Sequence, residues 1–178
     1  MEPPQWPAGP YEPASLADAS RLAACVVELA ALPRSLADAV AGLADDQLDT
    51  RYRNWTIRQI VHHLADSHGQ ALTRCRWALT EDHPTIKPYD ESRWAELGDA
   101  RFGPIEPSLA IVAGVHARWV GLLRSLDDDA WGRTFLHPEG DRVVPLTAMP
   151  DLYAWHGRHH VAQILWRREQ EGWGIGRA

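Results

Sequence analysis

The stretch TIRQIVHHLADSHGQALTRCRWALT, residues 56–80, has the apolar spacing of a long amphipathic helix. Thr56 is followed by Gln59 at the spacing of a capping box, which marks where the helix begins. At about 100° of rotation per residue, a set of side chains falls within roughly 60° of Ile57 and should face a core. The members of this stripe are Ile57, Val61, Leu64, His68, Leu72, Cys75 and Leu79.

Residues 15–43 predict a second helix, with Ser15 or Asp18 as a plausible N-cap. Its apolar positions recur at helical spacing and include Leu22, Val26, Leu29, Leu32, Leu36 and Val40. Pro33 lies inside this pattern. Because proline lacks the backbone N–H, we expect it to kink the helix or to split it in two.

Two more helices are predicted in the second half of the chain. SLAIVAGVHARWVGLLRSL, residues 108–126, begins with Ser108 as the expected N-cap. The last helix should run from Thr147, its expected N-cap, to Glu171, with Gly172 just past its end. Four helices and little strand predict an all-α fold, a four-helix bundle with long connections.

The connections are irregular in composition. Residues 1–14 hold five prolines and should form an extended arm, and residues 44–54 are typical of a loop. A short helix is expected near residues 91–97. The segment 133–146 indicates a hairpin that turns at residues 138–141. No boundary divides residues 1–178, so we expect a single domain.

Composition excludes some function classes. A net charge of −6 argues against nucleic acid as the partner, because phosphate binding requires a concentrated basic surface. No apolar run of about 18 residues and no signal-peptide pattern are present, which predicts a cytoplasmic protein without membrane contact. Cys25 and Cys75 lack metal-ligand spacing and are expected to be buried, reduced thiols.

The histidines of the helix at residues 56–80 point in three directions. His68 belongs to the buried stripe, and His62 falls on a face with Arg58 and Asp66 that we expect to be solvated. His63 lies on a shoulder of small and apolar residues that could border a cavity. Periodicity therefore favours His63 over His62 as a functional residue without deciding between them.

The last helix contains a histidine pair, His156 and His160, four residues apart on one face. Such a pair can place two imidazole nitrogens on one metal ion, although it also arises by chance in a chain with nine histidines. Tyr153, Gln163 and Arg167 share this face and are candidate catalytic residues, Gln163 also as a partner of a metal ligand. Three other histidines, His83, His116 and His137, have no second histidine at helical spacing. We expect them to be structural or exposed.

Several motifs together resemble the DinB/YfiT superfamily of metal-dependent four-helix-bundle proteins. They are NWTIRQIVHHLADSH, ALTEDHPTIKPYDESRWAEL, HARWVGLLRSL, YAWHGRHHVAQI and the N-terminal WPAGPYEPA. The similarity is strongest to the YfiT-type members, described as metal-dependent hydrolases and as bacillithiol transferases. It extends over nearly the whole chain.

The resemblance implies a metal triad of one histidine from the second helix and the pair from the fourth. The family's second-helix ligand precedes a leucine, which here selects His63, and the pair corresponds to His156 and His160. Neutral nitrogen ligands suit Zn, Ni, Co or Fe(II), of which we expect Zn or Ni. The resemblance also implies a homodimer. The segment LTAMPDLY departs from the family pattern at the entry to the last helix.

Three functions fit these residues. In the first, a low-molecular-weight thiol such as bacillithiol or mycothiol loses its proton on the metal and attacks a small electrophile. In the second, a hydrolase uses a metal-bound water with a pKa lowered to about 7. A carboxylate base is missing from the ligand face, which disfavours hydrolysis unless a loop supplies one. In the third, the metal only stabilises a non-catalytic stress protein.

Overall fold

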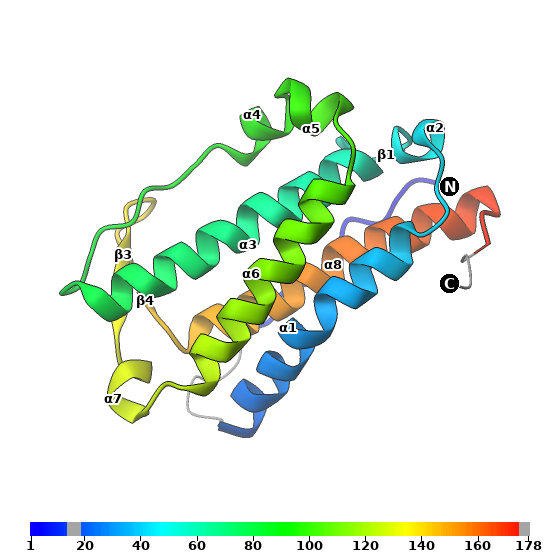
Figure 1. Cartoon of the computed structure of the whole chain (residues 1–178). Coiled ribbons are helices and arrows are strands. Elements are labelled where there is room, and N and C mark those ends of the chain that lie inside the picture. Colours follow the sequence, from blue (N-terminus) through cyan, green and yellow to red (C-terminus); the bar gives the residue numbers. More distant parts are fainter. Residues whose placement is uncertain (14–18, 175–178) are drawn as a thin grey trace.

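A computed structural model of the chain describes residues 1–13 and 19–174 and consists mainly of four long helices (Figure 1). The predicted all-α four-helix bundle is therefore confirmed. The long helices are α1 (Ala19–Val40), α3 (Ile57–Thr80), α6 (Glu106–Arg124) and α8 (Ala148–Glu171).

The order of the helices around the bundle differs from their order along the chain. Helix α1 packs against α6 and α8, and α3 packs against the same two helices. Helices α1 and α3, although consecutive among the long helices, therefore lie on opposite corners. This order makes α3 and α8 direct neighbours, which brings their two histidine clusters together.

The core is built by the predicted apolar stripes. Its fully buried members include Leu29, Leu36, Ile57, Leu64 and Ile164.

Helix α1 continues through Pro33 as one helix, so the predicted split is wrong. The candidate N-caps Ser15 and Asp18 lie outside the described residues. Both Cys25 and Cys75 are buried free thiols, as predicted.

Helix beginnings follow the sequence only in part. The capping box of Thr56 and Gln59 is present at the start of α3. Ser108, in contrast, does not cap α6, because that helix already begins at Glu106 and Ser108 is buried inside it. Thr147 precedes α8, but its side chain makes no capping hydrogen bond. Pro150 lies in the first turn of α8, where a missing N–H disturbs no helical hydrogen bond.

The connections carry more regular structure than predicted. Residues 44–56 contain a short helix and a small antiparallel pair, and the long connection before α6 contains two short helices instead of one. The predicted hairpin is present as β3 and β4. The shorter elements are α2 (Asp45–Leu48), β1 (Arg51–Tyr52), β2 (Trp55–Thr56), α4 (Glu91–Ala95), α5 (Gly98–Phe102), α7 (Asp128–Trp131), β3 (Thr134–His137) and β4 (Arg142–Pro145).

Residues 1–13 form the predicted arm without helix or strand, and the arm is fixed to the bundle by hydrogen bonds. The Tyr52 hydroxyl donates to the Pro4 carbonyl at 2.6 Å, and the Trp155 indole N–H donates to the Gly9 carbonyl at 3.0 Å. The Tyr11 hydroxyl donates to Asp151 at 2.9 Å. The arm therefore lies along the start of α8, close to its histidines.

None of the helices within residues 1–13 and 19–174 is long and apolar enough to span a membrane.

Candidate metal centre

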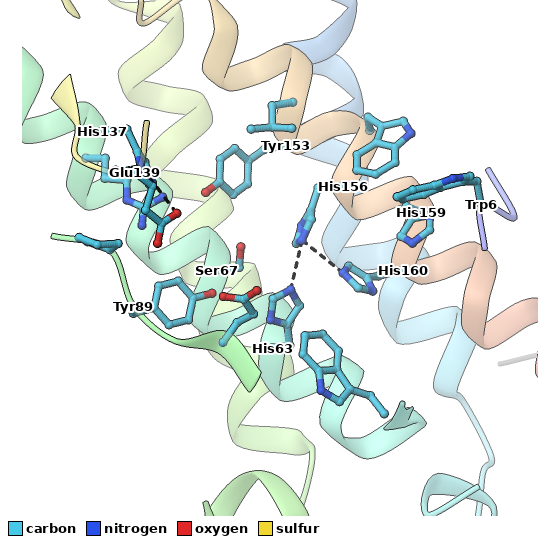
Figure 2. Close-up of a pocket in the computed structure, with 16 residues that line it drawn as sticks. Trp6, His63, Ser67, Tyr89, His137, Glu139, Tyr153, His156, His159 and His160 are labelled. Carbon is cyan, nitrogen blue, oxygen red and sulfur yellow. Dashed lines mark hydrogen bonds and ion pairs between the residues drawn. The ribbon is translucent and has the colours of Figure 1, made fainter. Parts of the chain in front are cut away.

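Three histidine side chains from α3 and α8 point toward one another at the floor of a cavity (Figure 2). The Nε2 atom of His156 lies 3.1 Å from Nε2 of His63 and 3.2 Å from Nε2 of His160. All three rings offer a nitrogen within 4.8 Å of the others. His63 comes from the shoulder of α3, and the other two project from α8 one turn apart.

The spacing of these nitrogens fits a metal ion. Two imidazole nitrogens on a tetrahedral zinc lie about 3.3 Å apart, given Zn–N bonds of about 2.0–2.1 Å. The Nε2–Nε2 distances from His156 to His63 and to His160 are slightly shorter than this value. Three neutral nitrogen donors suit Zn, Ni or another borderline transition metal, and they leave coordination positions open on the cavity side.

The protonation state of the rings also fits, because a histidine ligand must be neutral. Burial lowers the pKa of His63 to about 4. Burial, and secondarily the neighbouring rings, lowers the pKa of both His156 and His160 well below the ordinary value. The three rings are therefore neutral at pH 7 and ready to bind a cation.

The two candidate ligands on α8, His156 and His160, each have a partner for their other ring nitrogen. Nδ1 of His160 lies 2.8 Å from Oε1 of Gln163, and the Gln163 amide nitrogen lies 2.9 Å from Nε2 of His159. Nδ1 of His156 lies 3.2 Å from Nε2 of His68. Such outer partners fix the ring orientation and hold the Nδ1 proton, which leaves Nε2 free for the metal.

The cavity beside the three candidate ligands has a volume of about 580 Å³. Its walls carry an aromatic group, Trp6, Trp55, Tyr89, Tyr153 and Trp155, and polar side chains that include Ser67, Arg74, Glu91, His137 and Glu139. In Figure 2, Tyr153, Ser67 and Tyr89 lie on one side of the ligands, while Trp6 and His159 lie on the other. The size is that of a small-molecule site.

A family model described as the DinB superfamily matches residues 28–164, which include all three converging histidines. The chain belongs to the DinB superfamily. A Geobacillus thermodenitrificans protein with the name "Putative metal-dependent hydrolase" is 44% identical over 97% of this chain and 98% of its own length. YfiT of Bacillus subtilis, with the same description in its name, is 40% identical over 94% and 96%.

A solved structure of Bacillus subtilis YfiT superposes with a TM-score of 0.91 at 39% identity, covering 95% of this chain and 98% of that one. It is described as having an unusual four-helix bundle topology. In this DinB-superfamily chain, the diagonal placement of α1 and α3 departs from a simple up-and-down order.

The three candidate catalytic residues lie at different distances from this centre. Tyr153 lines the cavity and is buried, and Gln163 lies beside His160. Arg167 is not among the residues that line the cavity and forms an ion pair with Glu171 at 3.1 Å. Arg167 lies seven positions after His160 in α8. They share an angular face, but that spacing moves Arg167 roughly 10 Å along the axis.

The expected solvated position of His62 is also wrong. His62 is buried, and its Nδ1 lies 2.7 Å from the Ser108 hydroxyl. Neighbouring Arg58 is only 4% exposed and pairs with Asp49 at 2.7 Å. The cause is tertiary, since α4 and α5 of the long connection cover this face of α3. His62 nevertheless does not join the ligand group, which contains His63.

Several cavity residues had no signal in the sequence. Trp6, Trp55 and Trp155 would be assigned to the core by composition, yet they line the cavity. His137, which has no partner spacing in the sequence, lines it as well. Only a chain fold that brings the N-terminal arm and the β3–β4 hairpin to α8 could reveal these residues.

The burial of His63 predicts a pH-dependent stability for the metal-free protein. In the unfolded chain its pKa is near 6.5, and in the folded protein it is about 4. The unfolded state therefore binds more protons between these values, and folding stability is present above pH 6.5 and lost as the pH falls toward 4. We expect the urea midpoint of the metal-free protein to fall over this window, and to fall less in His63→Gln. If the urea midpoint fell equally with pH in the wild type and in His63→Gln, the lowered pKa of His63 would not be its cause.

Proposed function

We propose that this chain is a metal-dependent enzyme in which His63, His156 and His160 hold a divalent cation, with thiol S-transfer as its reaction. The observation that carries the proposal is a second cavity of about 450 Å³, lined by Gln5, Asn54, Ser92, Glu96 and Gln163 among others. Trp6, Trp55 and His160 line both cavities. Two cavities that meet at a metal ligand suit a reaction with two substrates.

A bound cation at this position lowers the pKa of a coordinated thiol, which makes the thiol a nucleophile at neutral pH. The residues of the chain do the remaining work. The three histidines supply neutral ligands and leave the cavity side open. Aromatic walls, including Trp55 and Trp155, exclude water and offer apolar surface to the electrophile.

The thiol in this proposal is a free small molecule and not a cysteine of the chain. Burial raises the pKa of the Cys75 thiol to about 12, so it stays protonated. Burial likewise raises the pKa of Cys25. Neither cysteine lines either cavity. The class of thiol expected is low-molecular-weight, as in bacillithiol or mycothiol.

Hydrolysis is the second candidate, and one observation favours it. Glu91 and Glu139 reach the cavity wall from α4 and from the β3–β4 hairpin, so a loop does supply the carboxylates that the ligand face of α8 lacks. The names of the relatives point the same way. Both carboxylates are exposed, however, whereas a general base must be held within hydrogen-bond reach of the proton it removes.

Turnover assays of zinc- and nickel-loaded protein separate the two reactions. We expect conjugation of a generic electrophile such as monochlorobimane that requires an added thiol, tested with bacillithiol and mycothiol in parallel, and that is lost in His156→Ala. A hydrolase would instead cleave esters or amides without thiol and lose that activity in Glu91→Gln or Glu139→Gln. Thiol-independent hydrolysis with no conjugation would overturn the transferase proposal.

A further inference from the structure

A chain of hydrogen bonds connects His156 on α8, through α3 and α6, to the backbone of α1. Nδ1 of His156 lies 3.2 Å from Nε2 of His68, and Nδ1 of His68 lies 2.9 Å from Nε2 of His116. Nδ1 of His116 lies 2.6 Å from the backbone carbonyl of Leu29. The four members come from α8, α3, α6 and α1, so the chain crosses all four long helices (Figure 1).

The Leu29 carbonyl is available because of Pro33. In an α-helix the carbonyl of residue 29 accepts from the N–H of residue 33, four positions later. Proline has no N–H, so α1 continues through Pro33 while leaving the Leu29 carbonyl without this donor. The carbonyl is buried, and a buried carbonyl without a partner is costly. The His116 ring supplies the missing donor.

The carbonyl fixes the direction of every bond in the chain. A carbonyl can only accept, so His116 carries its proton on Nδ1 and presents Nε2 as an acceptor. His68 must then donate from Nδ1 and accept at Nε2, and His156 must donate from Nδ1. His68 and His116 are fully buried or nearly so, which keeps each ring neutral with one proton. The result leaves a lone pair on Nε2 of His156, the atom that faces His63 and His160.

We propose that His68 and His116 are positioning residues that fix the His156 tautomer required for metal binding, with the Leu29 carbonyl as the group that sets the direction. The reverse direction would place a proton on Nε2 of His156, where the cation must bind. The partner of His160 is the Oε1 atom of Gln163, which accepts, but rotation of that amide would present its NH₂ donor instead, so this end is less fixed than a backbone carbonyl. The proposal rests on the metal centre, not on which reaction the centre performs.

Two variants at residue 116 test the chain by zinc affinity. His116→Leu offers no acceptor to Nδ1 of His68, so the hydrogen bond between His68 and His156 can then run in either direction. We expect this variant to bind zinc about 10–100-fold more weakly, the usual effect of losing an outer partner. His116→Glu keeps an acceptor toward His68 and should bind zinc more tightly than His116→Leu. Equal zinc affinity of His116→Leu and the wild type would overturn the proposal.

A measurement on the wild type needs no variant to fold. In the metal-free protein, ¹⁵N NMR of the histidine rings should show the proton on Nδ1 of His68, His116 and His156. A proton on Nε2 of His68 or His156 would overturn the proposal. These tautomers are measured without metal, so they test the chain of bonds even if the wild type binds no zinc. A wild-type protein that binds no zinc would refute the metal centre and leave the chain of hydrogen bonds intact.

Discussion

Replacing His160 with alanine is expected to abolish stable metal binding. The ring of His160 is buried, and its Nε2 is 3.2 Å from that of His156. Loss of one of three ligands should weaken zinc affinity more than about 100-fold, because removing an outer partner alone costs about 10–100-fold. Metal content after dialysis and a competition titration with a chromophoric chelator measure the effect, and nickel should follow the same pattern.

His83→Ala is the matched control for His160→Ala. His83 is exposed in the connection after α3, contacts Thr134, and neither belongs to the group of converging histidines nor lines the cavity. The control removes one of nine histidines without touching the three converging nitrogens. Its metal content should equal that of the wild type. Unchanged metal content in His160→Ala would break the assignment of the triad.

Replacing Trp119 with alanine should cause the largest loss of stability. Trp119 of α6 is fully buried, and its ring packs edge-on against Tyr153 at 5.4 Å and against His68 at 6.3 Å between ring centroids. Truncating a buried tryptophan costs about 3–5 kcal/mol, out of about 5–15 kcal/mol for a typical domain. Urea unfolding of the metal-free protein, followed by circular dichroism, measures the change in the free energy of unfolding.

Phe102→Ala serves as the control for Trp119→Ala. Phe102 lies at the end of α5 and is 73% exposed, so its removal should change stability by no more than about 0.5 kcal/mol. A Trp119→Ala loss as small as that of Phe102→Ala would show that the core can collapse around the missing ring.

The helices were predictable because their signals are local. Apolar spacing located α3 and α8 within a residue or two, and the Thr56–Gln59 capping box fixed where α3 begins. The i, i+4 spacing of His156 and His160 placed both rings on one face before any packing was known. These features depend only on the pitch of a helix.

Helical periodicity could not place several polar side chains, because it reports their angle around the helix axis and nothing about neighbouring elements. Arg167 shares an angular face with His160 and still lies outside the cavity. His62 and Arg58 occupy a face that is solvated in an isolated helix, and α4 and α5 cover it. His116, expected to be structural or exposed, is buried, and its partners His68 and Leu29 come from two other helices.

The sequence by itself determined the four helices, the absence of metal-ligand spacing around the cysteines and the histidine pair of α8. Through its resemblance to the DinB superfamily it also selected His63 over His62. Only the tertiary structure decided which side chains surround those histidines. The diagonal order of α1 and α3 makes α3 and α8 neighbours, and this order sets where His68, His116 and the Leu29 carbonyl meet. Contacts between helices far apart in the chain depend on packing, for which helical periodicity contains no information.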